Sequence, residues 1–324
     1  MKRNFLVLSV MILTALIHCH EGVTAESAKP YQLAIGGGAS GGIFNLVATG
    51  MATVINRYNP DIKASEQGTA ASLENVRLVG SNKLKLGLGN TDIGYYGFKG
   101  EREFKQSFPE LRAVMSSYMM YVYFLVRADS KIQSMADFKG KKIAVGAPGG
   151  GPDSVSRVLF PKYAGLERDK DYTPYFINVA ESMEALKDRT VDVAFVILGK
   201  PASSIIDITE SIGVRFIEIP SELMNRIVKE HPYWFKTGFK AGEYKGLKTD
   251  VTTMGIPALM FTNTSVPEDV IYKVTKTLLE KADDLGAIHP VGKEFKLESV
   301  KNGVAIPFHP GAKKYYMEKG VKVD

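Results

Sequence analysis

Two glycine-rich turns are the places in this sequence where backbone groups could bind an anion. The first turn follows the apolar run Leu33–Ile35 and has five glycines in Gly36–Gly42, directly before an amphipathic helical pattern. A strand that leads into a helix through glycines leaves N–H groups at the helix's positive end. A carboxylate or phosphate can be held there without a cationic side chain. We therefore expect Gly38, Ser40 and Gly41 to contact a ligand.

The second turn consists of Gly149, Gly150 and Gly151, after the strand pattern Ile143–Val145 and before a helix that includes Ser154. The order of strand, glycines and helix thus occurs once in each half of the chain. This repetition predicts two lobes whose helix N-termini face one cleft. We expect these glycines and Ser154 to contact the ligand from the second lobe.

Small polar residues occur at two further helix starts. Ser72 is predicted as the N-cap of a helix that carries Asn75, and both are expected to contact the ligand. Asn90 ends an alternating strand pattern, followed by Asp92 and Tyr95, and open α/β sheets place ligand contacts at such strand ends. Because Asp92 would repel a carboxylate, we expect it to orient a neighbour or to receive an ammonium group.

The first turn also matches a dinucleotide-binding pattern. Gly36, Gly38 and Gly41 fit G-x-G-x-x-G, and Glu66 lies at a distance suited to a ribose. An exported chain meets little nicotinamide cofactor, and the second turn would have no role in that fold. No cofactor is therefore expected.

A serine hydrolase is the alternative that stays open. Gly38, Ser40 and Gly42 fit G-x-S-x-G, and such an enzyme needs a histidine base with an acid partner. The candidate histidines of the mature chain are His231, His289 and His309. They are scattered, and no acidic cluster has ligand spacing, so no metal site is predicted.

The N-terminus has the pattern of a secretory signal peptide. Lys2 and Arg3 precede the apolar run Phe5–Ile17, and a cleavage site follows near Ala25. We therefore expect a periplasmic protein whose mature chain has no cysteine. Lipid attachment at Cys19 is the less favoured alternative.

Composition indicates a soluble, globular mature protein. Of the chain's residues, 45% are hydrophobic and 23% charged, and the net charge is +6. The basic residues are scattered and form no stripe with interleaved aromatics, so nucleic-acid binding is not expected. No other stretch reaches the ~20 apolar residues of a transmembrane helix.

Strand and helix patterns alternate along the chain and predict an α/β fold with mostly parallel sheets flanked by helices. The stretch 111–127 is predicted as two strands, and Val251–Thr262 as an extended return segment. The predicted lobes are 31–125 plus 255–324 and 126–254, with bending near Val126 and Thr253. Ser265–Glu268 is predicted as a capping box, and His231–Lys248 as a packed surface loop.

Taken together, these motifs resemble the TAXI family of solute-binding proteins of TRAP transporters. The resemblance covers essentially the whole mature chain. It rests on six short matches: Gly36–Phe44 for G-T-G-x-x-G-G-x-Y, Ser72–Asn75 for S-x-x-N, Asn90–Asp92 for Q-S-D, Gly149–Gly151 for G-S-G-T, Gly199–Pro201 for G-x-P, and Ile306–Tyr316 for I-P-x-H-P-G-A-x-x-Y. Phe44, Asn90, Gly150 and Pro152 depart from the family residues.

The resemblance implies a two-lobed periplasmic receptor with no enzymatic activity, expected to be a monomer. Such a receptor closes on a carboxylate or amino acid, in known relatives glutamate, glutamine or a similar solute, and delivers it to membrane permease subunits. It adds Phe44, Gly199 and Lys200 to the expected cleft residues. Because departures fall among these positions, the resemblance does not fix the identity of the solute.

Overall fold

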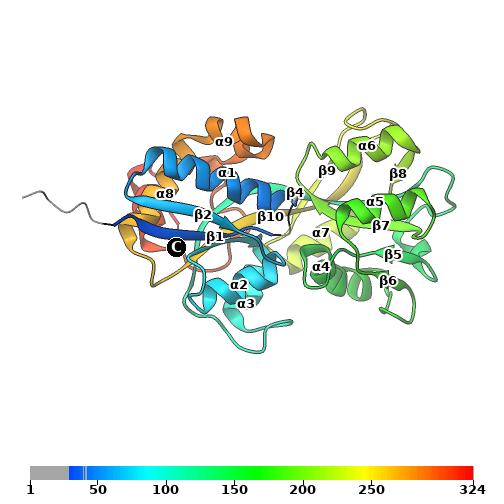
Figure 1. The fold of residues 1–324 in the computed structure, drawn as a ribbon. Helices are drawn as coiled ribbons and strands as arrows, with labels where there is room; N and C mark the ends of the chain where they lie inside the picture. Colours follow the sequence, from blue (N-terminus) through cyan, green and yellow to red (C-terminus); the bar gives the residue numbers. More distant parts are fainter. Residues whose placement is uncertain (1–28, 39, 41, 324) are drawn as a thin grey trace, which may run out of the picture.

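The computed structural model describes residues 29–38, 40 and 42–323. The predicted signal peptide, the cysteine at position 19 and the glycine at position 41 lie outside the described residues. The chain forms two lobes connected by long strands (Figure 1). One mixed sheet runs through both lobes in the order β2-β1-β3-β10-β4-β7-β5-β6, with β8 on β4 and β9 on β10. The predicted α/β class with a mostly parallel sheet in each lobe is confirmed.

The first lobe is built on three parallel strands covered by helices on both faces. Its strands are β1 (Tyr31–Gly36), β2 (Ile62–Gln67) and β3 (Leu86–Asn90). Its helices are α1 (Ile43–Tyr58), α2 (Ser72–Gly80), α3 (Thr91–Lys99), α8 (Glu268–Glu280), α9 (Ala282–Ile288) and α10 (Pro310–Glu318). Short 3-10 turns lie at Pro290–Glu294 and Leu297–Ser299. The α1 side chains Val47, Met51, Val54 and Ile55 are buried at helical spacing, which explains why this segment packs as a helix on the sheet.

The second lobe repeats this plan with shorter elements. Its strands are β5 (Lys142–Ala144), β6 (Thr173–Tyr175), β7 (Val193–Leu198), β8 (Val214–Phe216) and β9 (Phe235–Phe239). Its helices are α4 (Gly151–Leu159), α5 (Val179–Lys187), α6 (Ser203–Ser211) and α7 (Ser221–Glu230), with a 3-10 turn at Met135–Phe138 and a π turn at Phe160–Ala164. Among the described residues, no helix is both long and apolar enough to cross a membrane.

Two long antiparallel strands connect the lobes. The first, β4 (Leu111–Arg127), is continuous, so the prediction of two strands here was wrong. The second is β10 (Val251–Asn263). Tyr121 pairs both with Gly255 of β10 and with Leu198 of the second-lobe strand β7. At Tyr121, β4 therefore pairs with strands of both groups, while the predicted bending points Val126 and Thr253 lie farther along β4 and within β10.

Three other local predictions differ from the structure. The N-cap of α8 is Pro267 and makes no side-chain cap, so the expected capping box at the start of this helix is absent. Ser72 is the first helical residue of α2, because Ala71 takes the N-cap position with a φ of 69°. The segment His231–Lys248 is a surface loop only in its second half: Phe235–Phe239 forms β9, residues 240–248 are mostly exposed, and the part before β9 is mostly buried. Trp234 is 1% exposed, and its neighbour Tyr233 bonds to α3 of the first lobe.

Candidate functional site

The two glycine turns lie against the same helix start. A methyl group built on Gly38 would lie 3.5 Å from the Cβ atoms of Ala71 and Phe44, at the starts of α2 and α1. A methyl group built on Gly149 would lie 3.1 Å from Leu73 Cδ1, in the first turn of α2. Residues of both turns therefore meet at α2, and the lobes are closed on each other here.

Asn90 carries an unused buried amide between the lobes. The residue is 1% exposed, and its backbone N–H donates to Ser72 Oγ at 3.2 Å. Among the described residues, neither Oδ1 nor Nδ2 of its side chain has a hydrogen-bond partner. A methyl group built on Gly151 would lie 2.6 Å from Nδ2, so the start of α4 contacts this amide directly. Since an unpaired buried amide is costly, the site has hydrogen-bonding capacity for another molecule.

Asn75 holds the first turn in place. Its Nδ2 donates to the carbonyl oxygens of Gly36 at 3.0 Å, Gly37 at 2.7 Å and Leu88 at 2.8 Å. Its Oδ1 lies so close to Gly36 that a methyl group built there would be 2.4 Å away, and this oxygen has no partner among the described residues. Asn75 therefore connects the first turn to β3, besides any contact that it makes to a ligand.

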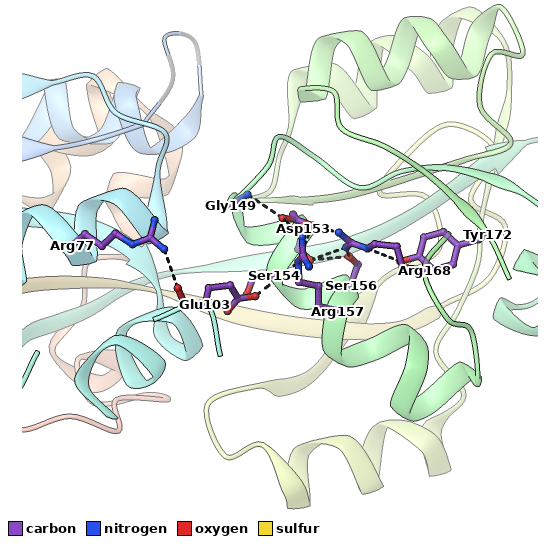
Figure 2. A network of polar contacts seen from close by, with 9 residues as sticks. All are labelled: Arg77, Glu103, Gly149, Asp153, Ser154, Ser156, Arg157, Arg168 and Tyr172. Carbon is purple, nitrogen blue, oxygen red and sulfur yellow. Dashed lines mark hydrogen bonds and ion pairs between the residues drawn. The ribbon is translucent and has the colours of Figure 1, made fainter. Parts of the chain in front are cut away.

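The second turn already holds a carboxylate of its own helix. Asp153 Oδ2 accepts the N–H of Gly149 at 3.0 Å, and Oδ1 lies 2.8 Å from Arg168 Nη1 (Figure 2). Pro152 removes a further N–H from the first turn of α4. The expectation that this turn offers bare N–H groups to an anion is therefore wrong for Gly149.

The start of α1 differs from that of α4 in charge. Its N-cap is Gly42, with no side-chain cap and no acidic residue in the first turn. In contrast, α2 has Glu74 and α3 has Asp92 in their first turns. Of these four helix starts, that of α1 is therefore the one whose first turn has no carboxylate of its own, although Glu66 of β2 accepts from Asn45 Nδ2 there at 2.8 Å.

Asp92 is buried behind this site. Its Oδ1 accepts the N–H of Ile93 at 2.9 Å, and Oδ2 has no partner among the described residues. Burial raises the pKa of Asp92 to about 7, while the Ile93 N–H and the nearby Trp234 indole oppose that rise. The Tyr95 ring lies 5.6 Å from the ring of Tyr233.

The remaining predicted residues have mixed positions. Phe44 packs against Tyr118, and a methyl group on Gly199 would lie 2.9 Å from Ile43 Cδ1, so both lie beside the start of α1. The ammonium group of Lys200 pairs with Glu243 at 3.0 Å and lies over the Tyr121 ring, and the structure does not bring it to the turns. Ser154 Oγ donates to Glu103 at 3.4 Å. Ser40 is exposed.

Several residues at the junction of the lobes were not predicted. Glu103, Arg157 and Arg168 form a polar network around α4, and Tyr118 has a buried hydroxyl with no partner among the described residues. Only one ion pair of this network could have been predicted from sequence spacing. Asp153 and Arg157 lie four residues apart on α4, a spacing that suits an ion pair.

The three histidines considered for a hydrolase have other partners. His231 Nδ1 bonds to the Tyr233 hydroxyl, and His289 Nδ1 accepts the Val291 N–H. His309 bonds at both ring nitrogens, to Val266 O and the Gly311 N–H. Burial lowers the pKa of His231 to about 4. In the part of the chain that the structure describes, no group of three potential metal-binding side chains occurs.

A family model fits nearly the whole described chain. The model of the NMT1-like family matches residues 35–320. The chain belongs to the NMT1-like family. The comparisons do not support the TAXI assignment, which remains a prediction from the sequence motifs for this NMT1-like protein.

Solved structures support the fold of the NMT1-like protein. XAC2383 from Xanthomonas citri, bound to chloride ion, is similar at 11% identity and a TM-score of 0.53, covering 89% of this chain and 95% of that one. A binding protein component of an ABC phosphonate transporter from Pseudomonas aeruginosa has 11% identity, a TM-score of 0.52 and coverages of 83% and 81%. A putative L-cystine ABC transporter from Listeria monocytogenes has 11% identity, a TM-score of 0.51 and coverages of 84% and 99%. At this identity the likeness concerns the fold alone.

Proposed function

We propose that this NMT1-like protein is an exported solute-binding receptor that captures a small amino acid between its lobes and delivers it to a membrane permease. The supporting observation is the buried, unused amide of Asn90 between the two glycine turns. The chain in this reading acts as a receptor and not as an enzyme. The signal-peptide pattern supports export to the periplasm.

The hydrogen-bonding groups favour an amino acid over a simple dicarboxylate. Asn90 offers both a donor, Nδ2, and an acceptor, Oδ1, and Asn75 Oδ1 is a second acceptor. An ionised dicarboxylate has only acceptors and would leave these oxygens unpaired. An amino acid brings N–H donors as well as a carboxylate. Its carboxylate would lie at the start of α1, whose first turn has no acidic residue and where the nearby Glu66 carboxylate already bonds to Asn45 Nδ2 at 2.8 Å.

The TAXI resemblance makes TRAP permease subunits our first choice of partner. Two structural relatives are described as parts of ABC transporters, so an ABC permease is the second choice. In either case we propose that the lobes are 31–125 plus 255–324 and 126–254, and that the cleft opens by bending of β4 near Val126 and of β10 near Thr253.

A thermal-shift screen tests the proposal. L-glutamine, L-glutamate, L-cystine and succinate are added to the purified protein, because a ligand that binds only the folded form raises Tm in proportion to the logarithm of its concentration. We expect an amino acid to raise Tm and succinate to have a smaller effect. Asn90→Ala tests the site and should reduce the shift clearly at the same solute concentration. Hydrolysis of generic esters that is lost in Ser40→Ala would favour the hydrolase instead.

A further inference from the structure

A polar network beside the turns joins the lobes through Glu103. This residue lies in the loop after α3 of the first lobe, and its backbone oxygen accepts from Arg77 Nη2 at 2.9 Å. Its carboxylate reaches the second lobe, where Oε1 accepts from Ser154 Oγ at 3.4 Å and lies 4.0 Å from Arg157 Nε (Figure 2). The contact therefore exists only while the lobes are closed.

The same network continues into the second glycine turn. Arg157 lies one helical turn after Asp153 on α4, and its Nε is 3.3 Å from Asp153 Oδ1. Asp153 also accepts the N–H of Gly149 and pairs with Arg168. One guanidinium group thus lies between a carboxylate of the first lobe and the carboxylate that shapes the second turn.

We propose that Glu103 and Arg157 form a clasp that favours the closed arrangement of the lobes without contacting the solute. Glu103 is positioned for this role because its side chain is 20% exposed and partly shielded from water, and its main-chain oxygen is fixed by Arg77. The clasp is weak, since the Arg157 side chain is 46% exposed. A partly exposed ion pair shifts an equilibrium roughly twofold to fivefold. The clasp therefore biases closure and does not lock the lobes.

Such a bias has a consequence for binding. If only the closed arrangement holds the solute, apparent affinity falls with the closed fraction. The solute and the clasp then both shift the equilibrium between open and closed lobes, although they contact different residues. Asp153 contacts both the Gly149 N–H of the second turn and Arg157 of the clasp, so a solute that displaces Gly149 also acts on the clasp through Asp153.

Distance measurements between the lobes test the clasp without any solute. Spin labels are placed at Lys63→Cys on β2 and Lys170→Cys in the second lobe, both exposed, in a chain that also carries Cys19→Ser. Pulsed electron spin resonance then compares the unaltered clasp with Glu103→Gln, which keeps an acceptor for Ser154, and with Glu103→Ala. Glu101→Gln, exposed in the same loop, is the matched control.

We expect the ratio of short to long distances to fall roughly twofold to fivefold in Glu103→Ala, less in Glu103→Gln and not at all in Glu101→Gln. Added salt should lower the ratio in the unaltered clasp but not in Glu103→Gln, because salt screens the ion pair. Identical distance distributions in the unaltered protein and in both Glu103 variants would overturn the proposal. Because no solute is present, this result is independent of the proposed function.

Discussion

The two glycine turns have the same local pattern but different chemistry. Both follow a strand and precede a helix, and both contact the start of α2. The first leads into α1, whose first turn has no acidic residue. The second leads into α4, where Asp153 already accepts the Gly149 N–H. The difference shows that glycines and a helix start are not enough to make an open anion site, because an acidic residue in the first helical turn can fill it.

This contrast suggests different roles for the two glycine turns in binding a solute. We propose that the first turn, with Asn75 and Asn90 behind it, provides recognition. The second turn is a preformed surface that covers Asn90 through Gly151 and is stabilised from within its own lobe. The following variants test this division, from the largest expected effect to the smallest.

Arg168→Ala should have the largest effect on stability. It leaves the Asp153 carboxylate, whose side chain is 4% exposed, without its closest cationic partner. Breaking a buried ion pair in this way costs about 3–5 kcal/mol. Urea denaturation measures the change in the free energy of unfolding. Arg157→Ala is the control, with an expected loss of about 1 kcal/mol or less. Equal losses in the two variants would show that the second turn does not depend on the Arg168 pair.

Asp92→Asn should change how stability depends on pH. Burial raises the pKa of Asp92 to about 7 in the folded protein, against an ordinary value of 3.8, so the folded state binds the proton more tightly than the unfolded state. The contribution of Asp92 to the free energy of unfolding is therefore fully present below about pH 4 and is lost as pH rises through about 7. The loss is at most about 4 kcal/mol. In Asp92→Asn, the free energy of unfolding at pH 8 should rise relative to that of the unaltered protein.

The check is a pair of denaturation curves at pH 5 and pH 8 for each protein. If the free energy of unfolding falls from pH 5 to pH 8 by the same amount in Asp92→Asn and in the unaltered protein, Asp92 does not titrate in this range.

Asn75→Ala tests the first turn directly. It removes three hydrogen bonds to buried carbonyl oxygens, and we expect a loss of about 2–3 kcal/mol in the free energy of unfolding. Solute-induced thermal shifts should disappear with it. Ser72→Ala, which removes a single acceptor, should cost about 1 kcal/mol. If Asn75→Ala keeps both stability and thermal shift, the first turn is held by other contacts.

Lys200→Met should have the smallest effect. Its ammonium group pairs with Glu243 within the second lobe, and a partly exposed pair contributes about 1 kcal/mol or less. Calorimetric affinity for the solute should stay within about twofold, since 1.4 kcal/mol is needed for a tenfold change. A tenfold loss would mean that Lys200 reaches the solute after all, and that recognition is shared by both lobes.

Much of the fold could be predicted because its signals are local. The apolar runs, their glycine ends and the amphipathic helices gave the two-lobed α/β plan and the return strand β10. The burial of Trp234 was not predictable in this way, since it depends on a contact between His231–Trp234 and α3 that forms only in the assembled molecule.

The candidate site shows the same limit. The turns and the polar helix starts were found from residue types, and the structure brings Gly38, Ser72, Asn90 and Gly151 together. The role of Asp153 was missed, because its partner Arg168 lies beyond the end of the helix and nothing in the local pattern connects the two. Lys200 was included by its motif, but its charge is satisfied by Glu243, which is distant in sequence.

The most direct test is calorimetric titration of the unaltered protein and of Asn90→Ala with the amino acids of the thermal-shift screen. Asn90→Ala removes the unused amide and leaves no new buried polar side chain, so the variant should fold with unchanged or higher Tm. The account predicts that affinity for the solute falls at least about tenfold, as expected when a hydrogen-bonding pair is lost. Affinity equal to that of the unaltered protein would contradict the assignment of the cleft between the two glycine turns as the solute site.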